Sequence, residues 1–185
     1  LPLSAGGSVS FVDIMSRDRT RLIEECKPTI MVGVPLLFSK IYKGIIRQIE
    51  ISKVKNFLFK YGGKKIIGAG LKRKLGGNLR IMVSGAAPMD PDVIEGYVNL
   101  GINFLEGYGL TETSPFITLL PMEYHERKMG SIGRAVPHAE IRIIDESGKE
   151  MPDGEPGELI VRGPMLMKGY HGDIQATRER IKDGW

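Results

Sequence analysis

The chain has 185 residues, of which 42% are hydrophobic and 26% are charged, and it carries a formal net charge of +4 at pH 7. Such values are typical of a folded globular protein and exclude a disordered chain. The longest apolar run is too short to span a bilayer, and the single cysteine, Cys26, excludes an internal disulfide. We therefore expect a cytoplasmic protein.

Both ends of the chain indicate a piece of a larger protein. The sequence begins with LPLSAGG, without an initiator methionine, and it stops at IKDGW, directly after a turn-like Asp183-Gly184. A helix or strand is expected to continue beyond such a turn.

The first third of the chain alternates between strand and helix patterns. Residues 8–13 alternate and are rich in β-formers, and residues 18–27 form a helical pattern that ends before Pro28. Residues 29–34, TIMVGV, are a continuous apolar run, which is typical of a strand covered on both faces. From Leu36 onward, apolar residues recur every four positions with basic residues between them, which predicts an amphipathic helix.

The same alternation continues in the middle of the chain. LRIMVSG, residues 79–85, predicts a strand, residues 91–100 predict a helix with Asp90 as its N-cap, and INFLEGYG, residues 102–109, predicts another strand. This order predicts an α/β fold in which a parallel sheet is flanked by helices.

After about Tyr124 the pattern changes to antiparallel β. AEIRIID and GELIVRG alternate over strand lengths and are joined by ESGKEMPDGEP, which is full of turn formers. A last helical pattern covers residues 175–182. We therefore expect an α/β subdomain over residues 1–124 and a β-rich subdomain over residues 125–185 that is truncated at its C-terminal end.

The positive charge is concentrated in one segment. Between Glu50 and Asp90 there are nine Lys or Arg residues and no acidic residue. One interpretation is attraction to a phosphorylated ligand or to an anionic membrane surface at which the protein would bind peripherally. We favour the alternative, a solvated pair of helices, because lysine-rich helix exteriors are common. We expect no nucleic-acid partner.

Two loops follow predicted strands at the edge of the sheet where ligands of α/β proteins bind. In VSGAAPMD, three residues with almost no side chain, Gly85, Ala86 and Ala87, would let a flat ligand reach the backbone. The second loop lies in FLEGYGLTETSPF. Nearby parallel strands would place the two loops side by side.

The second loop has the chemistry of a nucleotide site. The Tyr108 ring can stack on a base, the Thr111 hydroxyl can bind a phosphate oxygen, and the Glu112 carboxylate is a hard ligand for Mg²⁺. A turn capped by Thr111 or Thr113 explains the same residues equally well.

Several collinear segments then point to a known family: KPTIMVGVPLLFSKIY, LGGNLRIMVSGAAPMDPDV, GYGLTETSP, GSIGRAVPHAEIRIIDESGKEMPDGEPGELIVRGPMLMKGY and ATRERIKDGW. In this order they resemble the acyl-adenylate-forming (ANL) superfamily of AMP-binding enzymes, and they are most similar to long-chain fatty acid–CoA ligases. The resemblance implies that the β-rich part belongs to a β-barrel.

The resemblance also implies a role for each matching position. Thr111 and Glu112 would be catalytic, with Glu112 as the Mg²⁺ ligand, and Val34, Pro35, Ala86 and Ala87 would line the acyl site. The ATP and AMP site would comprise Gly85, Ala86, Ala87, Pro88, Glu106, Gly107, Tyr108, Gly109 and Thr111.

The implied reaction converts a fatty acid to an acyl-adenylate with ATP and then transfers the acyl group to coenzyme A. The alternatives are an adenylating enzyme for an aryl, amino or short-chain acid, and a non-catalytic nucleotide-binding relative. Since the family's phosphate loop and C-terminal domain do not lie within these 185 residues, we expect this polypeptide alone to be inactive.

Overall fold

The computed structural model describes residues 3–13, 16 and 18–185, which divide into two compact units. The first unit comprises Leu1–Ser84 and Pro88–Leu105, and the second comprises Gly85–Ala87 and Glu106–Trp185. Strand β3 (Asn103–Gly109) contributes residues to both.

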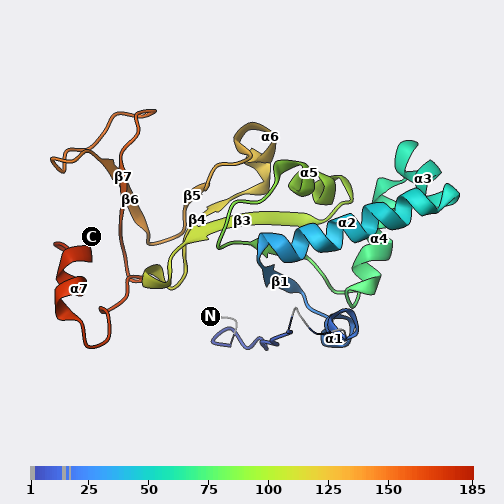
Figure 1. The fold of residues 1–185 in the computed structure, drawn as a ribbon, viewed down its shortest axis with the longest axis horizontal. Helices are drawn as coiled ribbons and strands as arrows, with labels where there is room; N and C mark the ends of the chain where they lie inside the picture. Colours follow the sequence, from blue (N-terminus) through green and yellow to red (C-terminus); the bar gives the residue numbers. More distant parts are fainter. Residues whose placement is uncertain (1–2, 14–15, 17) are drawn as a thin grey trace. The chain divides into compact units, whose positions relative to one another are not determined.

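The first unit is an α/β unit (Figure 1). Strand β1 (Ile30–Gly33) pairs in parallel with β2 (Ile81–Ser84). The order in the larger sheet is β1-β2-β3-β4-β5, where β4 (Phe116–Leu120) and β5 (Arg134–Ala135) belong to the second unit. Its helices are α1 (Arg19–Cys26), α2 (Pro35–Ile51), α3 (Lys53–Lys60), α4 (Lys64–Lys74) and α5 (Pro91–Asn99). The parallel strands and their helices confirm the predicted fold class.

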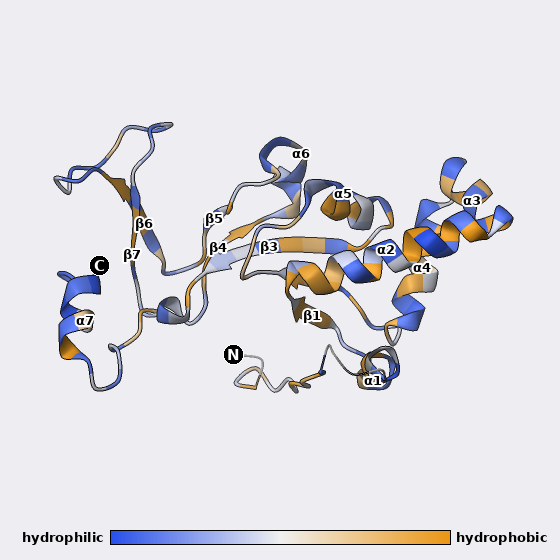
Figure 2. Ribbon diagram, in the orientation of Figure 1, coloured by the Kyte–Doolittle hydropathy of each residue, from blue (hydrophilic) through white to orange (hydrophobic). Residues whose placement is uncertain are grey.

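Local sequence signals explain where two of these helices begin. Pro35 and Pro91 each occupy a first-turn position, where proline fits because the missing N–H has no intrahelical partner. Asp90 Oδ1 accepts a hydrogen bond from the Asp92 N–H at 3.0 Å, so Asp90 is the predicted N-cap. Apolar and polar residues alternate along α2 (Figure 2), and its buried residues include Leu37 and Phe38.

An aromatic cluster forms the centre of the first unit. Phe38, Tyr97 and Phe104 are fully buried, and the Phe104 ring centroid lies 5.2 Å from each of the other two. The Tyr97 hydroxyl donates a hydrogen bond of 2.7 Å to the carbonyl of Phe38, which satisfies both groups away from water.

Two details of the sequence prediction are wrong. Residues 8–13 do not form a strand. In addition, only one face of β1 is covered within the first unit. Met31 is buried, whereas Ile30 and Val32 are 56% and 63% exposed. The exposed pair lies on the opposite face of the pleat from Met31.

The second unit is rich in antiparallel β structure. Strand β4 (Phe116–Leu120) pairs antiparallel with β3 and with β5 (Arg134–Ala135), and β6 (Glu140–Ile144) pairs antiparallel with β7 (Glu158–Arg162). The antiparallel hairpin predicted for AEIRIID and GELIVRG is thereby confirmed. The helical segments are η1 (Thr111–Thr113), η2 (Met122–Tyr124), α6 (His125–Lys128) and α7 (Ile174–Arg180). Among the described residues, no helix is long and apolar enough to cross a membrane.

The Tyr97 hydrogen bond gives a stability prediction. Tyr97→Phe keeps the ring but leaves the buried Phe38 carbonyl without its donor, so we expect the free energy of unfolding to fall by about 1–3 kcal/mol. Urea denaturation measures this change. The control, Tyr61→Phe, alters a tyrosine that is mostly exposed and should leave the unfolding midpoint unchanged. Equal midpoints for both variants would contradict the role of Tyr97.

Candidate active site

The two loops singled out in the sequence meet within the second unit. A Cβ atom added to Gly85 would lie 3.3 Å from the carbonyl oxygen of Gly107 and 3.4 Å from a ring carbon of Phe116. The SGAAP loop therefore runs directly beside the GYG segment of β3, as the sequence analysis expected.

The glycines of the GYG segment have a structural reason of their own. A side chain at Gly107 would collide with the Phe116 ring, and one at Gly109 would collide with the carbonyl of Pro115. The bare backbone thus allows β4 and its preceding turn to pack closely on β3. Packing against β4 is therefore a reason for these glycines that differs from the one predicted from sequence, which is close approach of a ligand to the backbone.

Ala86 has an unusual backbone conformation in the first of these loops. Its φ of +71° lies in the left-handed region, and its side chain is exposed. A non-glycine residue in that region costs about 1–2 kcal/mol. Such strain clusters at ligand-binding segments, and here it occurs at a residue assigned to the nucleotide and acyl sites from the sequence.

The turn after β3 separates a structural threonine from two available side chains. Thr113 is buried, and its Oγ1 accepts a hydrogen bond of 2.9 Å from the Leu110 N–H. The same hydroxyl lies 3.0 Å from the Leu110 carbonyl and 2.9 Å from that of Pro115, and it can donate to one of them. Thr113 therefore provides the turn cap that the sequence left open between two threonines, while Thr111 is exposed and Glu112 is half-buried.

Glu112 is held in place by a residue 58 positions later in the chain. The Tyr170 hydroxyl donates a hydrogen bond of 2.7 Å to Glu112 Oε1, and the Met167 N–H donates one of 2.8 Å to the Glu112 carbonyl. The Tyr170 hydrogen bond is the main cause that lowers the pKa of the Glu112 carboxyl below its usual value. Glu112 is thus an ionised carboxylate at neutral pH.

Tyr170 is the functional candidate that sequence reasoning missed. It belongs to the VRGPMLMKGY segment, which carries part of the family resemblance and contains no pattern that predicts a chemical role. Its own N–H donates to Thr177 Oγ1 at 2.9 Å, so α7 helps to fix the residue that orients Glu112.

The carboxylate at Glu112 suits a metal ion only in company with a ligand. No group of three or more His, Cys, Asp and Glu residues in the described part of the chain could hold a metal by itself. Mg²⁺ commonly takes one or two carboxylates and obtains its remaining ligands from phosphates and water. One ionised glutamate therefore fits the predicted metal ligand of a site shared with a nucleotide.

The remaining predicted residues are divided between the units. Glu106 and Tyr108 are half-buried in β3, where they lie opposite Leu120 and Thr118 of β4. Val34, Pro35 and Pro88 belong to the first unit, with Val34 at the N-cap of α2 and Pro35 at its first turn. The second unit thus contains the nucleotide loops and Glu112. Pro88 and the two residues at the start of α2 belong to the first unit.

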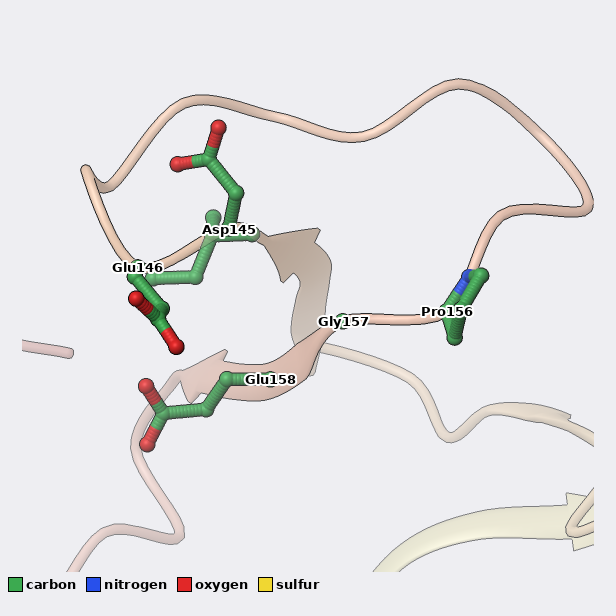
Figure 3. A pocket seen from close by; sticks show the side chains of 6 residues that line it. Asp145, Glu146, Pro156, Gly157 and Glu158 are labelled. Atoms are coloured by element: carbon green, nitrogen blue, oxygen red, sulfur yellow. The ribbon is translucent and has the colours of Figure 1, made fainter.

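A separate cavity of about 380 Å³ lies on the β6–β7 hairpin (Figure 3). It is lined by Ile144, Asp145, Glu146, Pro156, Gly157 and Glu158. Asp145 Oδ1 accepts hydrogen bonds from Ser147 and Lys149, and these bonds, chiefly that of the Ser147 hydroxyl, lower the pKa of Asp145. The Asp145 carboxylate therefore serves the structure of the hairpin turn.

Comparison with known proteins identifies the family of the chain. The family model of the AMP-binding enzymes matches residues 1–171, so the chain belongs to the AMP-binding enzyme family. This confirms the resemblance to the acyl-adenylate-forming superfamily.

Individual relatives include ligases for different acids. The chain is 36% identical over 183 residues to the peroxisomal long chain acyl-CoA synthetase 7 of Arabidopsis thaliana, an alignment that covers 86% of this chain and 26% of the relative. It is 39% identical over 108 residues to a feruloyl-CoA synthase of an Amycolatopsis species, covering 58% of this chain and 22% of that protein.

A solved structure gives the same result for the fold. The amide bond synthetase McbA from Marinactinospora thermotolerans superposes with a TM-score of 0.75 at 27% identity, over 99% of this chain and 33% of that one. The chain therefore spans about a quarter of the length of the curated relatives it matches and about a third of this structure.

The Tyr170 contact leads to a prediction about the pKa of Glu112. Tyr170→Phe removes the hydrogen bond that stabilises the charged carboxylate, so we expect the Glu112 pKa to rise toward its ordinary value. A carboxyl-detected NMR titration measures it directly. Tyr124→Phe, which changes another tyrosine of the second unit, should leave the Glu112 pKa where it is. An unchanged Glu112 titration in Tyr170→Phe would show that the two side chains do not interact in solution.

Proposed function

We propose that this chain is the nucleotide-binding core of an ATP-dependent, AMP-forming fatty acid–CoA ligase. The observation that carries the proposal is the ionised Glu112 carboxylate, which Tyr170 fixes on a turn that also presents the exposed Thr111 hydroxyl. Membership of the AMP-binding enzyme family and similarity to a long chain acyl-CoA synthetase support it.

The proposed reaction has two group-transfer steps. In the first, a carboxylate oxygen of the fatty acid attacks the α-phosphorus of ATP and forms a new O–P bond. The bond from the α-phosphorus to the bridging oxygen of the β-phosphate breaks, and pyrophosphate leaves. In the second, the sulfur of coenzyme A attacks the acyl carbon, a C–S bond forms, the C–O bond to AMP breaks, and the thiol proton is released.

The residues of the second unit would bind and orient ATP. We assign adenine to the backbone of Gly85–Ala87 and Glu106–Gly109, with the Tyr108 ring available for stacking on the base. Thr111 would donate its hydroxyl to a phosphate oxygen. Glu112 would hold Mg²⁺, which supplies neutralisation of the charge that accumulates on the phosphates. Because Glu112 is already ionised and oriented, its ligand geometry would not have to form during the reaction.

The acyl group is assigned to the small residues of the SGAAP loop and to the start of α2. Ala86 and Ala87 have small side chains, and Val34 and Pro35 are apolar. Apolar walls bind a long alkyl chain readily, because each buried methylene contributes about 0.8 kcal/mol. The similarity to a feruloyl-CoA synthase keeps an aryl acid as the second candidate substrate.

The role of Glu112 can be tested by removing its charge. In the full-length protein, Glu112→Gln should leave the melting temperature unchanged and reduce pyrophosphate release from ATP and a fatty acid by at least about 100-fold, in the range of a lost electrostatic stabiliser. Glu123→Gln changes an exposed glutamate of η2 in the same unit and should retain full activity. Wild-type turnover by Glu112→Gln would remove Glu112 from the mechanism.

The substrate class needs its own experiment. A panel of long-chain, short-chain, aryl and amino acids is offered to the full-length protein, and pyrophosphate release and acyl-CoA formation are measured for each. We expect the highest kcat/KM with long-chain fatty acids, because their binding energy grows with each buried methylene. A preference for aryl or short acids would overturn the fatty acyl assignment and leave the adenylation chemistry in place.

A further inference from the structure

Helix α3 presents an apolar face to solvent. Val54, Phe57 and Tyr61 are 71%, 62% and 74% exposed. Val54 and Phe57 lie three residues apart on one side of α3, and Tyr61 is the C-cap residue that follows the helix. The rings of Phe57 and Tyr61 lie side by side, with centroids 4.6 Å apart. An aromatic pair next to a branched aliphatic side chain is a larger apolar group than isolated surface residues provide.

The packing of the first unit does not account for this face. None of the described α3 residues is buried, although the helix contacts α2 and α4. Figure 2 shows that α3 contains both hydrophobic and hydrophilic residues. The neighbouring helices also end or begin with exposed apolar side chains, at Ile51 of α2 and Ile66 of α4.

Basic side chains border the apolar face. Lys53 and Lys60 lie four residues before and three residues after Phe57, so both are its neighbours on the helix surface. Further basic residues follow in the same stretch of chain, namely Lys55, Lys64, Lys65, Lys72, Arg73 and Lys74. Within the described part of the chain, none of these side chains forms an ion pair, although the Lys64 ammonium lies over the Phe59 ring, 5.3 Å from its centroid.

We propose that the face formed by Val54, Phe57 and Tyr61 with Lys53 and Lys60 docks on an anionic lipid bilayer. Lysines attract the negative lipid head groups, while aromatic and aliphatic side chains enter the boundary between head groups and acyl chains. The long run without acidic residues supplies the charge complementarity that commits this face to a negatively charged partner.

The exposed apolar residues distinguish this partner from the alternatives. A solvated helix pair, the interpretation favoured from sequence, needs polar residues where Val54 and Phe57 stand. A nucleic acid duplex would use the lysines but would gain little from Val54 and Phe57, because its bases are already stacked on one another. The inference does not depend on the proposed ligase activity, because it uses residues outside the candidate active site.

Vesicle binding by the full-length protein tests the proposal. We expect co-sedimentation with vesicles that contain phosphatidylserine, at least about tenfold weaker binding to vesicles of phosphatidylcholine alone, and weaker binding to the anionic vesicles at high salt. Val54→Ser/Phe57→Ser and Lys53→Glu/Lys60→Glu should each weaken binding to the anionic vesicles roughly tenfold or more.

Matched controls separate this face from general charge and hydrophobicity. Lys40→Glu/Lys43→Glu makes the same charge change on exposed lysines of α2, and Ile174→Ser removes an exposed apolar side chain from α7. Both controls should bind as the wild type does. All substituted side chains are exposed, so circular dichroism should show unchanged melting.

A second measurement places the helix in the lipid. Phe57→Trp should show a blue shift of its additional fluorescence when anionic vesicles are added. The proposal would be overturned by equal binding to neutral and anionic vesicles or by unchanged binding of both α3 variants. It would also be overturned if the additional fluorescence of Phe57→Trp did not shift. Binding to a duplex oligonucleotide in place of vesicles would assign the basic face to nucleic acid and would equally overturn it.

Discussion

The close approach of Gly85 to Gly107, with the Phe116 ring packed against both, is the contact on which the candidate site depends. It joins the loop after β2 to the edge of β3, although the two segments are 22 residues apart in the sequence. A side chain at Gly107 has no room beside the Phe116 ring, and a Cβ at Gly85 would fit only tightly, so close packing restrains the backbone of both loops. The groups assigned to adenine binding are therefore positioned by packing before any ligand arrives.

Within the next turn, adjacent residues have different tasks. Thr113 uses its hydroxyl on the backbone of the turn and is buried, whereas Thr111 and Glu112 remain accessible. A carboxylate on a loose turn would lose much of its value as a ligand, since it would have to be ordered during binding. Here the order is supplied from two sides, by Thr113 through the backbone and by Tyr170 through the carboxylate.

Much of this arrangement could be predicted from the sequence, because local signals decide it. The apolar run at β1, the Asp90 cap and the alternating hairpin of β6 and β7 each follow from a local pattern. The segment 8–13 has the alternation of a strand, but alternation makes a strand only where a neighbour completes its hydrogen bonds.

The residues missed by prediction act over long sequence distances. Nothing in GYGLTET indicates that Phe116 will cover the glycines, or that Tyr170 will return to Glu112. The same limit explains Val32, whose apolar character indicated a buried strand although the first unit leaves its side chain exposed. Tertiary partners decide these positions, and a single sequence does not display them.

The modest net charge conceals a strong internal separation of charge. The segment between Glu50 and Asp90 is basic throughout, whereas residues 145–158 of the β6–β7 hairpin contain six acidic residues and one lysine. A negatively charged surface attracts the first segment and repels the second. Electrostatic attraction alone is reversible and weakens with salt, and the exposed Phe57 and Val54 add a contribution that salt does not screen. The coincidence of both features on α3 is therefore the reason to assign that helix to a membrane surface and not to solvent.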